Sequence, residues 1–171
     1  MHLQSKRQAA FTLPELMVTA MILGVFFSGI FEVSGLCMRY ISSSKENING
    51  IECVQDRVEQ LRNLSFANLA DNSTVKTAMA TPPNSSGLAK LGTETVTLTN
   101  FSGTSASSPT VTYTRTGGAT SATMSPAGFT GFDTTAVTAL QVDVSYTWTA
   151  VLGRRARTQS SSTIVVAGTK K

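Results

Sequence analysis

The feature that most constrains this chain is an apolar run near its N-terminus. Residues 11–31, FTLPELMVTAMILGVFFSGIF, contain Glu15 as their only charged side chain. A bilayer core about 30 Å thick needs about 20 apolar residues in a helix, so this run is long enough to cross a membrane. Residues 1–10 before it contain Lys6 and Arg7 and no acid. Because basic flanks stay on the cytoplasmic side, we expect a single-pass protein with most of the chain across the membrane.

Glu15 separates this run from ordinary apolar segments. Three other interpretations compete for such a run: a secretory signal peptide cleaved near residues 33–35, a simple single-pass anchor, and the buried helix of a soluble core. A carboxylate at membrane depth costs on the order of 2.5–3.5 kcal/mol on insertion scales, and none of these three structures gains from it. An acid in this place therefore indicates a functional site with a partner.

The residues around Glu15 form a specific pattern. A basic leader ends at Ala10, Phe11 follows it, Glu15 comes four positions after Phe11, and a long apolar stretch continues from there. This combination resembles the prepilin signature of type IV pilins and type II secretion pseudopilins. The resemblance covers about the first 35 residues of the chain. It implies that prepilin peptidase cuts between Ala10 and Phe11 on the cytoplasmic face, and that the new amino group of Phe11 is then N-methylated. These families usually carry Gly before the cut, where this chain has Ala10.

Elementary electrostatics agrees with an assembly role for Glu15. Cleavage before Phe11 creates an α-amino group, which is mostly cationic at neutral pH. A buried carboxylate is tolerated when it is paired and hydrogen-bonded. In a filament, the Phe11 amine of an incoming subunit can meet Glu15 of a neighbour and set the axial register. The partners that the resemblance implies are prepilin peptidase, other pilin or pseudopilin subunits, an inner-membrane assembly platform and membrane lipid.

A helical pattern continues beyond the apolar run. No proline occurs between Glu15 and Thr81, so we predict one nearly continuous helix over residues 12–66. Residues 11–34 need lipid or other helices around them, whereas residues 35–66 are amphipathic and need a globular domain on one side. The predicted apolar face of the second part consists of Ile41, Ile48, Ile51, Val54, Val58, Leu61 and Leu64. The polar positions between them are Lys45, Glu46, Glu52, Gln55, Asp56, Arg57, Glu59 and Arg62.

The two cysteines lie on this predicted helix. Cys37 and Cys53 are 16 residues apart, which places them about 24 Å apart along a helix. A disulfide requires Cα atoms roughly 4.4–6.8 Å apart, so an internal bond is excluded if the helix forms. We expect Cys37 to act as a small apolar residue at the membrane boundary, and Cys53 to be packed or a free thiol.

The remainder, residues 67–171, is predicted to hold Ser/Thr-rich loops and an antiparallel sheet. The overall fold class is therefore α+β, with the long helix packed on a small sheet as in pilins. Alternation rich in β-branched residues predicts the strands, and Pro, Gly, Asn and Ser clusters predict the loops. The predicted strands are residues 93–99, 110–114, 140–148 and 162–166, and the predicted loops are residues 71–92 and 116–131.

The C-terminal hairpin indicates the kind of subunit. The strand with Trp148, a turn over residues 152–157 and the short return strand resemble the C-terminal part of minor pilins and minor pseudopilins. Many major pilins close a C-terminal loop with a cysteine pair, and this chain has none there. Both observations favour a minor subunit. In the turn, Arg154, Arg155 and Arg157 are candidate ligand contacts, although three basic residues in a turn more often form a solvated hairpin tip.

The sequence gives little support to an enzyme, a metalloprotein or a nucleic-acid-binding protein. The only histidine is His2 in the leader, and no nucleophile–base pair, phosphate loop or metal-ligand spacing occurs. We therefore expect no catalytic residue, no metal, no cofactor and no enzymatic activity. Removing residues 1–10 leaves 12 basic against 10 acidic residues, a weak footprint for nucleic acid.

The sequence thus predicts a structural subunit of a type IV pilus or type II secretion pseudopilus. Its expected location is the bacterial inner membrane, with the head domain in the periplasm, and then the assembled filament. One alternative is an adhesin or DNA-uptake pilin that binds a ligand through its head. Another is a single-pass anchored domain that never polymerises.

Overall fold

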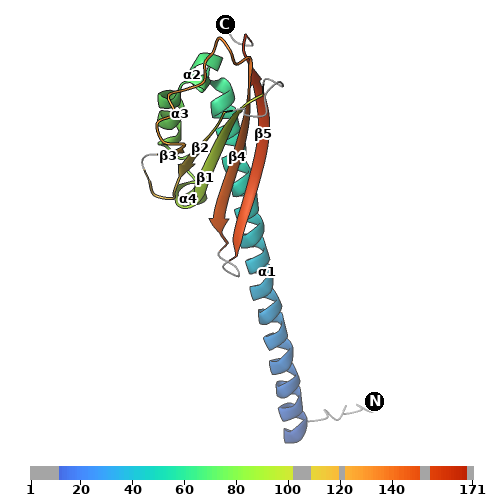
Figure 1. The fold of residues 1–171 in the computed structure, drawn as a ribbon. Helices are drawn as coiled ribbons and strands as arrows, with labels where there is room; N and C mark the ends of the chain where they lie inside the picture. Colours follow the sequence, from blue (N-terminus) through green and yellow to red (C-terminus); the bar gives the residue numbers. More distant parts are fainter. Residues whose placement is uncertain (1–11, 102–108, 120–121, 151–154, 169–171) are drawn as a thin grey trace, which may run out of the picture. The chain divides into compact units, whose positions relative to one another are not determined.

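The computed structural model describes residues 12–101, 109–119, 122–150 and 155–168 (Figure 1). Its longest element is helix α1, Leu13–Asn63. The chain divides into two compact units, Met1–Ser42 and Ser43–Lys171, and α1 contributes to both. The single long helix predicted over residues 12–66 is confirmed.

In the first unit, the described chain is the N-terminal part of α1. Pro14 lies in the first turn, where backbone N–H groups have no intrahelical acceptor, so its missing N–H costs nothing. The N–H groups of Glu15 and Leu16 both donate to the carbonyl of Thr12, at 3.0 and 3.1 Å. Glu15 also lies at the positive end of the helix dipole, which favours an acid there.

The second unit is built on an antiparallel sheet with the strand order β3-β2-β1-β4-β5 (Figure 1). The α+β fold class and the strands predicted over residues 93–99, 110–114 and 140–148 are confirmed. The observed strands are β1 (Thr93–Asn100), β2 (Thr110–Arg115), β3 (Thr123–Ser125), β4 (Ala139–Thr149) and β5 (Ala156–Val166).

Two strands differ from the prediction. β3 lies inside the stretch 116–131 that we predicted to be a loop, and its three residues are too few to show an alternating pattern. β5 begins at Ala156 instead of at residue 162, because it pairs with β4 along the full length of both strands. Their register runs from Ala139 opposite Val166 to Thr149 opposite Ala156.

The alternation along the strands places one face of the sheet in the core. Along β4, every second residue from Leu140 to Trp148 is buried. The core-facing residues of β1 and β2 pack with them and with the C-terminal part of α1. On the opposite face the strands carry mainly threonine and serine, and some of these hydroxyls pair across strands, as Thr147 and Thr158 do at 2.9 Å. The head core therefore lies on one face of the sheet, under the C-terminal part of α1 and the short helices that follow it.

The predicted loop over residues 71–92 is in part wrong, because it contains two helices. After α2 (Phe66–Ala70), α3 spans Asn72–Met79 and α4 spans Gly87–Leu91. Asp71 caps α3 by accepting a hydrogen bond from the N–H of Thr74 at 2.9 Å, and Ser86 caps α4 in the same way. Val75 and Met79, four residues apart, point into the core. The Ser/Thr-rich composition concealed these short capped helices.

The buried face of α1 also differs from the predicted one. Val54 and Leu61 are buried as expected, and Val58 and Leu64 are partly buried. Ile41, Ile48 and Ile51 are exposed instead, by 51%, 55% and 42%. Gly50 and Cys53 are buried in their place.

The reason for this shift is a close contact between α1 and β4. A Cβ atom at Gly50 would lie 2.4 Å from Cη2 of Trp148, so the indole ring occupies the space of the missing side chain. The helix therefore turns Gly50 and Cys53 toward the sheet.

Arg57, which we predicted at a polar position, is fully buried together with Glu94 and Arg115. The Glu94 carboxylate accepts from Nε and Nη2 of Arg57, the latter at 3.1 Å, and from Nε of Arg115 at 3.1 Å. Arg57 also donates to the carbonyls of Ala78 and Thr81, at 2.7 and 2.6 Å. This charged cluster ties α1 to the sheet, to the last turn of α3 and to the chain just after it.

Candidate functional site

The candidate site is the surface of α1 in the first unit. Every described side chain from Thr12 to Ser42 is exposed. Large apolar side chains dominate, with Leu13, Met21 and Phe31 exposed by 76%, 76% and 74%. The helix is long and apolar enough to cross a membrane: an 18-residue window has a mean hydropathy of 2.1, and none of it is buried. Apolar area in water costs about 25 cal/mol per Å², so lipid or other helices must cover this surface.

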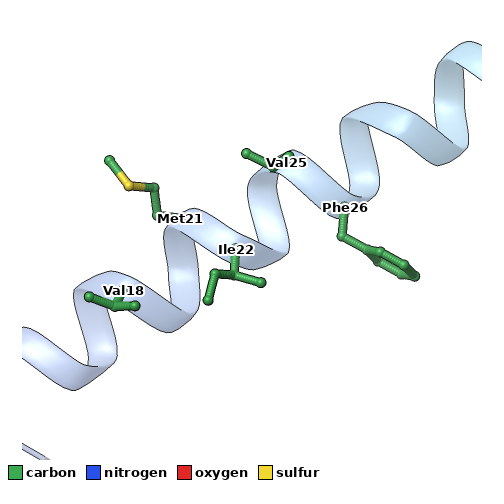
Figure 2. A pocket seen from close by; sticks show the side chains of 5 residues that line it. All are labelled: Val18, Met21, Ile22, Val25 and Phe26. Atoms are coloured by element: carbon green, nitrogen blue, oxygen red, sulfur yellow. The ribbon is translucent and has the colours of Figure 1, made fainter.

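Shallow grooves run between the apolar side chains of this helix. Figure 2 shows one of them, lined by side chains on successive turns: Val18, Met21, Ile22, Val25 and Phe26. A second groove continues the first along α1, from Val25 to Ser34. A third groove lies among Leu16, Thr19, Ala20 and Leu23. Such grooves between i, i+3 and i+4 side chains are the surfaces into which the ridges of another helix pack.

Glu15 is the acid of this surface. It lies in the first turn of α1 and is exposed. Its backbone carbonyl accepts a hydrogen bond from Oγ1 of Thr19 at 2.8 Å. Within the part of the chain that the structure describes, its carboxylate has no hydrogen-bond or ion-pair partner. A second acid, Glu32, lies at the other end of the uncharged segment 16–31, and sequence reasoning passed over it.

Three predicted site residues lie outside the described residues: Ala10, Phe11 and Arg154. The leader, residues 1–10, lies outside them as well. The cleavage between Ala10 and Phe11 and the methylation of Phe11 therefore stay predictions.

The other two arginines of the hairpin have different environments. Arg155 is exposed. Arg157 lies in strand β5, opposite Trp148, and not in the predicted turn. Its guanidinium donates to Oδ1 of Asn47 at 2.5 Å and to Oγ of Ser43 at 2.9 Å. Arg157 thus holds β5 against α1, which leaves its guanidinium less available for a ligand.

The cysteines are free thiols on the same helix. Cys37 is exposed and Cys53 is buried, so the predicted packing of Cys53 is confirmed. Sγ of Cys53 lies 3.9 Å from Oδ1 of Asn84 and 3.8 Å from Oγ of Ser86. Burial raises the pKa of the Cys53 thiol above its ordinary value, which keeps it protonated and unreactive.

Comparison with known proteins identifies the N-terminal segment. The model of the prokaryotic N-terminal methylation motif matches residues 5–31, a range that includes Glu15 and most of the exposed apolar surface. No curated protein matches the chain, and no solved structure does. Among the described residues, no group of three His, Cys, Asp or Glu side chains could hold a metal ion.

Proposed function

We propose that this type IV pilin-like protein is a minor structural subunit of a type IV pilus or type II secretion pseudopilus, which polymerises through its N-terminal helix. The observation that carries the proposal is the methylation motif over residues 5–31, on a helix that is exposed and mainly apolar from Leu13 to Ser42. Lipid covers such a surface before assembly, and neighbouring helices cover it in a filament. An inner-membrane assembly platform would move the subunit from one environment to the other.

Processing precedes assembly in this proposal. Prepilin peptidase cuts between Ala10 and Phe11 on the cytoplasmic face, because the basic leader with Lys6 and Arg7 stays on that side. The amino group of Phe11 is then methylated. The head, which includes the sheet, lies in the periplasm.

In this proposal, Glu15 sets the axial register between neighbouring subunits during assembly. A lone carboxylate among apolar helices is unfavourable, and pairing with a cation offsets that cost. The Phe11 amine of an adjacent subunit is such a cation, and it reaches Glu15 at one axial offset only. Subunits packed at other offsets leave Glu15 unpaired, so the correct offset is favoured.

The intact mass of the mature protein tests the processing step. We expect a chain that starts at Phe11 and carries one extra methyl group. A chain that starts at Met1, or near Leu36 after signal-peptide cleavage, would contradict the proposal. As a matched pair, Ala10→Gly keeps a small residue before the cut and should be processed, whereas Ala10→Arg should retain the leader.

A further inference from the structure

Two exposed basic side chains lie at the end of the head where α1 enters it. Lys45 is on α1 and Arg155 comes directly before β5, and both are exposed. Arg157 joins the two elements, because its guanidinium donates to Asn47 and to Ser43 of α1. The first residues of β5 therefore lie beside the first turns of α1 in the head. We call Lys45 and Arg155 the basic end of the head.

Few acidic side chains balance the basic end. The sequence has no Asp or Glu after Asp143, so the strand that carries Arg157 contains no acid. On α1, the neighbouring Glu46 is half-buried. The next acid, Glu52, comes seven residues after Lys45, which is about 10 Å along the helix. The basic end therefore presents positive charge, which suits an anionic partner.

The length of α1 places a membrane surface next to the basic end. A bilayer with its headgroup regions is about 40–45 Å thick, which takes up about 30 residues of helix at about 1.5 Å each. Counted from Leu13, these residues end near Ser42. Arg39 and Tyr40 come just before this limit, and both residue types are common at membrane–water interfaces. Lys45 follows the limit by three residues, or about 4.5 Å.

Both basic residues lie within the range of a charged lipid surface. The attraction of Lys and Arg to anionic lipid extends over about one Debye length, which is about 8–10 Å at moderate salt. Lys45 is inside this range. Arg155 is inside it too, because Arg157, two residues later, contacts Ser43 at the start of the head. A membrane surface surrounds the helix on every side, so the two residues need not share one side of α1.

We propose that the basic end binds the anionic phospholipid headgroups of the membrane that α1 spans, and that Arg157 positions β5 for this contact. The inference rests on the membrane anchoring in the proposed function, but not on polymerisation. Anchoring keeps the lipid surface beside the basic end, so the effective concentration of headgroups there is high. Soluble nucleic acid lacks this advantage, and two exposed basic residues bind it weakly. The lipid contact has to break when the subunit leaves the membrane.

Fluorescence quenching in reconstituted vesicles tests the contact. The full-length protein carries a dye on Ala156→Cys, an exposed position next to Arg155, in a Cys37→Ser background that leaves only the buried Cys53. The vesicles contain a small fraction of lipid with a spin-labelled headgroup, in phosphatidylcholine alone or mixed with phosphatidylglycerol. We expect quenching to be about twofold or more stronger in the anionic vesicles. It should return to the neutral level in about 1 M salt, where the Debye length is about 3 Å.

Removing the two charges tests the residues. Lys45→Gln combined with Arg155→Gln should lower the ratio of bound to free heads by about fivefold for each charge, so that quenching in anionic vesicles falls to the neutral level. The melting temperature of the head should stay unchanged, because both side chains are exposed.

A matched variant is the control. Lys76→Gln combined with Lys90→Gln removes the same charge from exposed positions of α3 and α4. These helices meet α1 near Arg57 and Cys53, further along α1 from the membrane limit. This variant should keep the full quenching.

Three outcomes would overturn the lipid contact alone: equal quenching in the two kinds of vesicle, equal losses in the two double variants, or binding of the basic end to soluble DNA without a response to lipid charge. Protein that separates from the vesicles on flotation would overturn the membrane anchoring in the proposed function as well.

Discussion

The charged residues of the head are of two kinds: a buried cluster around Glu94, and the accessible helix cap Asp71. Glu94 lies between Arg57 and Arg115 with no exposure to solvent, and Nη1 of Arg115 has no hydrogen-bond partner among the described residues. Two buried cations around one carboxylate are tolerated only while the carboxylate is present. Asp71, in contrast, is an accessible cap whose carboxylate interacts with its own helix.

Removing the carboxylate of Glu94 should therefore strongly destabilise the head. We expect Glu94→Ala to lower the free energy of unfolding by about 3–5 kcal/mol, because it leaves Arg57 and Arg115 as uncompensated buried charges. Denaturant unfolding of the full chain in detergent measures this. Glu59→Ala, at an exposed position of α1, should change the same quantity by less than about 0.5 kcal/mol. Equal effects of the two substitutions would show that the cluster does not stabilise the head.

Asp71 gives the head a distinct acid dependence. Its Oδ2 accepts from Oγ of Ser73 and from N and Oγ1 of Thr74, at 2.6, 2.9 and 2.6 Å. These hydrogen bonds lower the pKa of Asp71 from 3.8 to about 2. The folded pKa is the lower one, so this stabilisation is complete above about pH 4 and is lost as the pH falls toward 2.

The comparison of Asp71→Asn with the unchanged protein isolates this effect, because Asn also caps helices but does not titrate. The difference in melting temperature between the two should be largest above pH 4 and should shrink as the pH falls from 4 to 2. A difference that stays constant over this range would mean that Asp71 carries no special stabilisation.

Among the elements, α1 has one side in the head core and another side that is exposed. Its core side meets β4 through Gly50 and Trp148 and meets β5 through Arg157. Its other side is exposed and carries Ile48 and Ile51. β5 can be long because β4 offers it a partner at every residue, although the sequence of β5 alternates only weakly. The position of α1 on the sheet therefore depends on the close contact of Gly50 with Trp148 and on the hydrogen bonds of Arg157.

Gly50→Ala tests this packing of helix on sheet. The added Cβ would lie 2.4 Å from Cη2 of Trp148, so the ring or the helix must move. We expect a loss of about 1–3 kcal/mol of stability, as for other overpacked cores, despite the better helix propensity of alanine. Gly87→Ala is the control, because a Cβ there meets nothing within 4 Å. Thermal unfolding of both variants measures the difference, and a stabilised Gly50→Ala protein would refute this account of the contact.

For the whole molecule, the division of α1 between two compact units matches two environments. The first unit exposes its apolar side chains and needs an apolar surrounding. The second unit has a core of its own and presents a surface of hydroxyl groups on its sheet. Such a molecule can exchange lipid for neighbouring helices around its first unit without refolding its second.

Assembly should depend on one acid of α1 more than on the other. We expect Glu15→Ala to be cleaved and inserted normally but to lose most of its assembled fraction, because the Phe11 amine of the neighbour then has no buried partner. Glu32→Ala removes the other acid of this part of the helix and should assemble normally. Sedimentation or co-isolation with sister subunits measures the assembled fraction. Normal assembly of Glu15→Ala would favour the anchored domain that never polymerises.

The sequence alone was sufficient for features that depend on neighbouring residues. The apolar run with Glu15, the long helix and the strands over residues 93–99, 110–114 and 140–148 follow from composition and periodicity, which are local properties. The capping residues Asp71 and Ser86 were also readable, but the Ser/Thr-rich surroundings hid them.

Tertiary structure decided which side of α1 is covered. Arg57 is buried because Glu94, 37 residues later, and Arg115 arrive from the sheet, and Gly50 is buried because Trp148 needs its space. Ile48 and Ile51 consequently point outward, although their spacing fits an inward face equally well. Helical periodicity shows that a helix has an apolar side, but the side that enters the core depends on the shape and charge of distant partners.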